Sequence, residues 1–177
     1  WVMTALHTPG HTSNHTCFAL DDGTTRTLFT GDHVMGWSTT VVSPPDGDMA
    51  DYMESLDRMA ARPESRLLPG HGPPVEDAHA RIAELRRHRL AREAAILDRI
   101  HAGDTTIPEM VAAIYRDVDP GLHPAAARSV LAHLEAFTSL GHPMLLAASR
   151  KRFLGELLAR ESPMAELRPT DGRDDAT

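Results

Sequence analysis

Three short apolar runs in the first half of the chain each lead into a turn in which a glycine is followed directly by a histidine or an aspartate. The side chains that follow these glycines are His11, Asp32 and His71. A strand that ends at such a turn can hold a side chain rigidly at the edge of a sheet. Because imidazole and carboxylate groups are common zinc ligands, the three junctions together predict a metal site at one sheet edge.

The spacing of apolar and turn-forming residues around these junctions predicts an α/β fold. Four runs are typical of strands, with an Asp-Asp-Gly hairpin turn between the middle two: 2–7, 16–20, 26–30 and 66–69. An apolar stripe predicts a helix from Asp48 to about Arg62. Strand, hairpin, helix and returning strand form one layer pair of an α/β sandwich. Residues 36–47 predict an irregular loop, which either lines a substrate pocket or simply connects its neighbours.

The second half of the chain predicts helices. The longest covers residues 76–101, and shorter ones run from Thr105 or Thr106 to Tyr115 and from Pro124 to about Leu140. The long helix is rich in arginine, which favours a solvated face with intrahelical ion pairs. The alternative is a non-enzymatic helical module that binds RNA through four of these side chains, Arg86, Arg87, Arg89 and Arg92.

Composition narrows the class of protein. The 177 residues include one cysteine, which excludes a disulfide framework and fits a reducing, cytoplasmic compartment. Cys17 lies in an expected buried strand, which favours a structural thiol. The net charge of −7 argues against general nucleic-acid affinity, although a local basic patch stays compatible with it. No apolar run approaches transmembrane length, so no membrane contact is expected, and the oligomeric state stays open.

The residues at the three junctions resemble the metallo-beta-lactamase superfamily. That family carries a Gly-His-Thr histidine, a Gly-Asp aspartate and a Pro-Gly-His-Gly histidine in this order, which match His11, Asp32 and His71. The residues that flank these positions are most similar to the branch of the family that contains beta-lactamase-like protein 2. The resemblance implies part of an αββα sandwich over residues 1–79. It also implies a helical, winged-helix-like region over residues 80–132.

The same resemblance implies a site with two metals, usually zinc. His11 would bind the first metal, His71 the second, and Asp32 would bridge them as the catalytic carboxylate. His15 and His33 are expected to support these ligands or to be ordinary loop residues, rather than to bind metal themselves. A metal-activated water would then hydrolyse an ester, a thioester, a lactam or an RNA phosphodiester.

One part of the family pattern does not occur in this sequence. The His-x-His-x-Asp-His motif, which supplies further ligands and orients the water, is missing. We therefore expect two protein ligands per metal, weak metal binding and little or no hydrolysis by this chain alone. The chain begins with Trp1 inside an expected strand, which predicts a fragment or a joined product.

The sequence of the last residues resembles a second family, dihydropteroate synthase. The stretch from Gly141 to Gly155 and the final polar residues carry this likeness, which assigns residues 133–177 to a synthase-like segment and places the joint at about 131–138. The resemblance implies that Ser149 and Lys151 contact the aminobenzoate and pterin ends of the substrates. A fragment of this transferase, from folate biosynthesis, is therefore the second hypothesis, and a chimera is the preferred explanation of the join.

Overall fold

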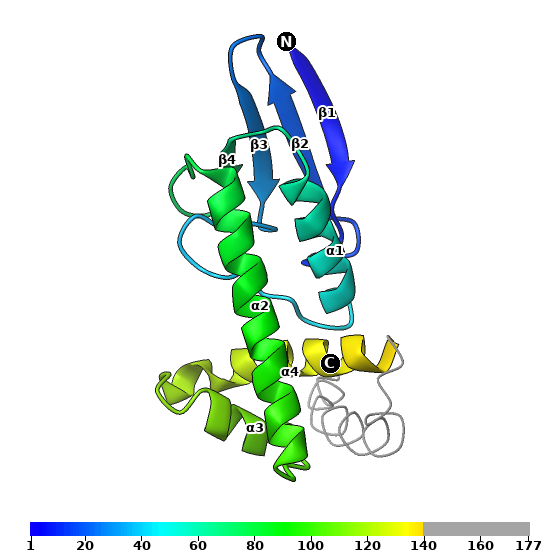
Figure 1. The fold of residues 1–177 in the computed structure, drawn as a ribbon, viewed down its shortest axis with the longest axis vertical. Helices are drawn as coiled ribbons and strands as arrows, with labels where there is room; N and C mark the ends of the chain where they lie inside the picture. Colours follow the sequence, from blue (N-terminus) through cyan, green and yellow to red (C-terminus); the bar gives the residue numbers. More distant parts are fainter. Residues whose placement is uncertain (140–177) are drawn as a thin grey trace, which may run out of the picture.

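A computed structural model describes residues 1–139 (Figure 1). Within this range the chain forms a mixed α/β structure with one sheet, and this confirms the α/β class expected from the sequence. The strands are β1 (Val2–His7), β2 (Thr16–Asp21), β3 (Arg26–Gly31) and β4 (Arg66–Pro69). The helices are α1 (Met49–Ala60), α2 (Ala78–His101), α3 (Ile107–Ile114), the 3-10 turn η1 (Pro120–Leu122) and α4 (His123–Ser139).

The sheet has the strand order β1-β2-β3-β4, and its topology brings three strand ends together. β2 is antiparallel to both β1 and β3, whereas β4 is parallel to β3. Therefore β1, β3 and β4 all run in one direction, and their carboxyl ends meet at the same edge. The side chains that follow these three strands are thereby brought to one side of the sheet.

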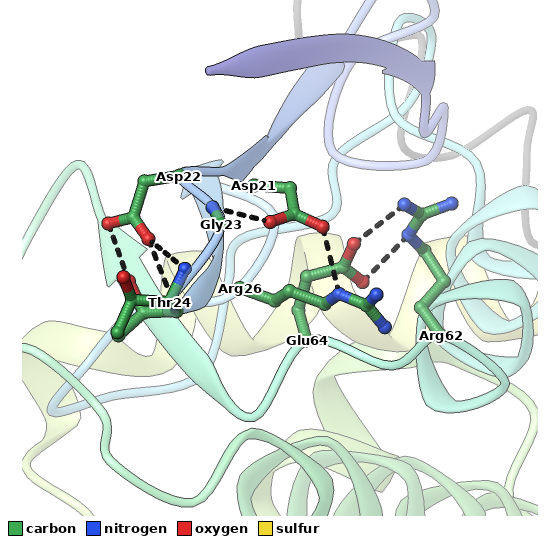
Figure 2. Close-up of polar contacts among 8 residues, drawn as sticks. Asp21, Asp22, Gly23, Thr24, Arg26, Arg62 and Glu64 are labelled. Carbon is green, nitrogen blue, oxygen red and sulfur yellow. Dashed lines mark hydrogen bonds and ion pairs between the residues drawn. The ribbon is translucent and has the colours of Figure 1, made fainter.

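The predicted hairpin between β2 and β3 is confirmed, and local hydrogen bonds explain its turn (Figure 2). The Asp22 carboxylate accepts hydrogen bonds from the backbone N–H groups of Thr24, at 2.8 Å, and Thr25, at 2.7 Å. Gly23 has a φ of 87°, a conformation that side chains with a Cβ rarely adopt. The turn chemistry thus sets the register in which the two strands pair.

Helix α1 covers the sheet together with the first half of α2 (Figure 1). Asp48 caps α1 as predicted, because its side chain accepts a hydrogen bond from the N–H of Asp51. Tyr52 and Leu56 are fully buried on the face that packs toward the sheet, each contributing about 1.5–3 kcal/mol of hydrophobic stabilisation. Cys17 is buried in the same core, as expected, and burial raises the pKa of its thiol to about 11.

A second core lies where the last half of α2 packs with α3 and α4. Ile96 of α2, Met110 of α3 and Val130 of α4 are its fully buried members. The predicted start of α3 at Thr106 is confirmed, since Thr106 and Glu109 form a reciprocal capping box. Because α2 contributes to both cores, it connects the sheet region to the helical region.

The arginines of α2 do not form the continuous basic surface that the RNA hypothesis needs. Arg89 is only 3% exposed, Arg86 pairs with Asp57 at 2.6 Å, and the Arg92 guanidinium stacks over the Tyr115 ring. The expectation of a solvated face is also wrong for Arg89, because periodicity cannot show that α4 would cover it. None of the helices in residues 1–139 is long and apolar enough to span a bilayer.

The expected segment boundaries stay predictions. Residues 79/80 lie inside α2, and 132/133 lie inside α4, so both expected boundaries interrupt continuous helices. Ser149 and Lys151, with the strand and helix expected around them, lie outside the described residues.

Candidate metal centre

The three junction side chains meet at the sheet edge where β1, β3 and β4 end. His11 Nε2 lies 4.0 Å from Asp32 Oδ2, and His71 Nε2 lies 3.4 Å from Asp32 Oδ1. Each carboxylate oxygen therefore faces one imidazole, with Asp32 between the two histidines. The carboxylate is 38% exposed, which leaves the centre open to solvent. The geometry thus brings together the residues that the sequence singled out, although His11 and His71 are far apart along the chain.

His11 is held by a backbone contact that fixes its tautomer. Its Nδ1 lies 2.7 Å from the Val41 carbonyl oxygen, so Nδ1–H donates this hydrogen bond and Nε2 carries the lone pair. A lone pair facing a carboxylate is unfavourable unless a proton or a cation lies between them. The donor set therefore fits a metal ion, for which the free nitrogen of a neutral imidazole is the required ligand.

The loop that carries His11 is anchored on both sides. The Asp46 carboxylate accepts hydrogen bonds from the backbone N–H of Ser13, at 3.1 Å, and from its hydroxyl, at 2.7 Å. These bonds hold the pKa of Asp46 below its usual value. On the other side, Ser55 of α1 donates to the carbonyl of Pro9 at 2.8 Å. These contacts fix the backbone of the loop that carries the His11 imidazole.

The glycines of the other two junctions are required by close approach. A Cβ on Gly70 would lie 2.9 Å from Asp32 Oδ1, and a Cβ on Gly31 would lie 2.8 Å from His15 Nε2. Gly31 also has a φ of 50°, and the N–H of Gly70 donates to the Gly31 carbonyl at 2.8 Å. Gly70 therefore leaves room for the Asp32 carboxylate, and Gly31 leaves room for the His15 imidazole.

His15 and His33 lie behind the centre. His15 Nδ1 contacts the Thr8 hydroxyl at 2.9 Å, and burial, followed by the nearby His11, lowers the His15 pKa. His33 is fully buried, with ring-centroid distances of 5.3 Å to His15 and 4.6 Å to Tyr52. Burial lowers the His33 pKa to about 3, which keeps this ring neutral. Both positions are compatible with the supporting roles expected from the sequence, which stay predictions.

The ligand set that these residues offer is partial. Within residues 1–139, no group of three or more His, Cys, Asp or Glu side chains is arranged to hold a metal ion. The centre consists instead of two histidine–aspartate pairs that share Asp32, whereas a catalytic zinc normally has three protein ligands. The sequence does not reveal the Val41 carbonyl, because a backbone acceptor in an irregular loop leaves no residue signal.

Comparisons with protein families identify the chain's relatives. Residues 3–71 match the model of the metallo-beta-lactamase superfamily, and residues 106–141 match the beta-lactamase associated winged helix domain. The second match extends through residues 133–141, which the sequence analysis assigned to a synthase-like segment. The comparisons give no support to that segment.

Individual relatives cover most of this chain. The beta-lactamase-like protein 2 homolog of Drosophila melanogaster is 34% identical over 139 residues, which are 77% of this chain and 45% of the relative. The atrochrysone carboxyl ACP thioesterase of Aspergillus chevalieri is 34% identical over 125 residues, covering 66% of this chain and 39% of the relative. This chain therefore spans less than half the length of these curated relatives.

Solved structures show the same fold. A metallo-beta-lactamase family protein from Thermus thermophilus superposes with a TM-score of 0.66 and 28% identity, covering 78% of this chain and 44% of that protein. A beta-lactamase domain protein from Burkholderia ambifaria gives a TM-score of 0.63 and 26% identity, covering 78% and 43%. The chain belongs to the metallo-beta-lactamase superfamily and carries the winged helix region that accompanies it.

Proposed function

We propose that this chain forms part of a metal-dependent hydrolase that cleaves a carboxylic ester or thioester. The observation that supports this most directly is the position of Asp32, whose two oxygens face the Nε2 atoms of His11 and His71. The thioester class is favoured because two similar proteins are named thioesterases. Lactams and RNA phosphodiesters are the less favoured substrates.

In this proposal His11 would hold one divalent metal and His71 another, and Asp32 would supply the carboxylate that both share. Zinc is the expected metal, since imidazole and carboxylate ligands suit it. A divalent ion bound there acts as a Lewis acid, which lowers the pKa of water and polarises a carbonyl group.

Neighbouring residues of the chain orient the ligand side chains and shape the space around them. The Val41 carbonyl accepts the Nδ1 proton of His11 and so leaves Nε2 free to coordinate. Gly70 keeps space beside Asp32 Oδ1. The neutral ring of His33, together with Tyr52, forms a buried wall behind the centre and excludes water from that side. The reaction therefore takes place on the solvent-exposed side, near His71.

Zinc titration by calorimetry tests the ligand assignment. Because this chain supplies two ligands per metal, we expect a Kd weaker than about 1 μM, which is about −8 kcal/mol of binding free energy. Asp32→Asn should abolish binding, because it removes the charge that both metals share. Asp117→Asn removes a carboxylate from the helical region and serves as the matched control. If Asp32→Asn bound zinc as tightly as the unmodified chain, Asp32 would not be a ligand.

Hydrolysis tests the substrate class separately. A thioester with a chromogenic thiol product should be cleaved slowly with zinc and not at all by Asp32→Asn. A zinc-dependent rate that survived this substitution would contradict the proposed role of Asp32.

A further inference from the structure

A cavity of about 310 Å³ lies between the irregular loop, the middle of α2 and the start of α4, separate from the metal centre. Its size is at the lower end of the range for small-molecule sites. One wall is largely apolar and includes Val42, Leu122 and Ala126. The lining also includes two arginines of α2, Arg89 and Arg92. The cavity thus combines an apolar surface with concentrated positive charge.

The two arginines lack a counter-charge in the described part of the chain. The ion pairs of residues 1–139 involve other arginines and leave Arg89 and Arg92 without a carboxylate partner. The Nε–H group of each is buried and has no hydrogen-bond acceptor within the same residues. Burying a guanidinium without a counter-charge or a full set of acceptors is unfavourable.

The existing contacts orient the guanidinium groups without neutralising them. Arg89 donates to the carbonyl of Thr40 and to the Ser129 hydroxyl, and it lies 5.2 Å from the Tyr52 ring centroid. Arg92 lies 4.1 Å from the ring centroid of Tyr115. These aromatic contacts help to hold each guanidinium group in place, and the Nε–H donors of both arginines remain without an acceptor in the described residues.

The surrounding histidines respond to the same positive potential. The pKa of His88, which also lines the cavity, is lowered first by burial and then by Arg89 and Arg92. Burial and the same two arginines lower the pKa of His133 to about 3. Glu84 is the only acid found to act on either histidine within residues 1–139, and it acts on His88 alone.

We propose that this cavity binds an amphipathic anion, with Arg89 and Arg92 holding a phosphate or carboxylate group and the apolar wall holding a short hydrocarbon body. Arginine forks match either oxyanion with paired hydrogen bonds. The site lies against the loop that also contacts His11 of the metal centre, since Thr40 accepts from Arg89 and its neighbour Val41 accepts from His11. An anionic ligand here would therefore sit beside the proposed hydrolase site without touching its ligands.

Calorimetric titration of the full chain with four probes tests this site. Hexyl phosphate and hexanoate carry the two candidate oxyanions on one tail, inorganic phosphate lacks the tail, and hexylamine reverses the charge. We expect one-to-one binding of at least one anionic probe with a Kd below about 1 mM, and no binding of hexylamine. The tighter of the two anions identifies the headgroup. Absence of binding by both, or equal binding of hexylamine, would overturn the proposal.

Substitutions locate the binding. Arg92→Gln should weaken the better probe by about tenfold or more, since a charge-assisted contact is lost. Arg87→Gln, which removes an exposed charge from the same helix, is the matched control and should bind as the unmodified chain does. Arg92→Lys keeps the charge and should retain intermediate affinity, which a misfolded variant would not. Unchanged affinity in Arg92→Gln would refute the assignment.

The site is independent of the metal centre in this test. Asp32→Asn, which should lose zinc, is expected to keep its affinity for the anionic probe. Failure of zinc binding and failure of anion binding can therefore be told apart.

Discussion

Substituting Gly70 with alanine should damage the metal centre through a single methyl group. The new Cβ would lie 2.9 Å from Asp32 Oδ1 and 3.2 Å from the Gly31 carbonyl carbon, whereas ordinary contacts begin at 3.4 Å. The carboxylate would have to retreat by 0.5 Å, the difference between 2.9 and 3.4 Å. Metal–ligand distances vary by only about 0.2 Å, so the displaced Asp32 carboxylate would no longer be within coordination distance of a metal held by either histidine.

Two measurements follow from this displacement. The free energy of unfolding in urea should fall by only about 1 kcal/mol, the lower end of the usual cost of overpacking, because the Asp32 carboxylate is 38% exposed and can move away from the new methyl group. Zinc affinity should fall by about tenfold or more, which corresponds to about 1.4 kcal/mol. Gly121→Ala, a glycine change in η1 far along the chain, should leave zinc affinity unchanged. The reasoning would be refuted if Gly70→Ala bound zinc as tightly as the unmodified chain.

Two further predictions concern buried polar groups. Tyr52→Phe removes the hydroxyl that donates to the His33 carbonyl at 3.1 Å. That carbonyl still accepts from Thr40 at 2.9 Å, so urea denaturation should show a loss of only about 0.5–1.5 kcal/mol, and a loss well above about 3 kcal/mol would contradict this. His133 has a pKa of about 3 when folded and an ordinary value of 6.5, so its stabilisation is present above pH 6.5 and is lost as the pH falls toward 3. Between about pH 7.5 and about pH 5.0 this histidine should account for a loss of about 2 kcal/mol, which His133→Gln should abolish. An identical pH dependence in the variant would show that folding does not lower the pKa of His133 and would contradict this prediction.

The elements that local chemistry defines could be predicted from the sequence. Asp48 and Thr106 start helices because their side chains accept hydrogen bonds from the first turn. Gly23 marks a hairpin because its backbone takes a positive φ. The glycines before Asp32 and His71 were informative for a related reason, because each such junction ends a strand and leaves space for a polar side chain.

Contacts between distant segments could not be predicted in the same way. The Val41 carbonyl that fixes His11 comes from a loop without periodic structure, and only the folded chain places it there. The burial of Arg89 depends on Thr40 and on Ser129 of α4, which lie 49 and 40 residues away. A charged residue on a helical face gives no sign of which later segment will cover it.

The RNA hypothesis depended on such an unseen contact. Four arginines on one helix suggested a basic surface, yet their environments differ, since Arg86 is paired with Asp57 and Arg89 is buried. Tertiary packing therefore turned part of an apparent surface patch into a cavity wall. The same packing gives α2 its position between the two cores.

The most direct test of the metal centre is anomalous X-ray diffraction from crystals of this chain soaked in zinc and measured at the zinc absorption edge. Our proposal predicts one anomalous peak beside His11 and Asp32 and a second beside His71 and Asp32. Peaks at other residues, with none beside Asp32, would contradict the proposed centre.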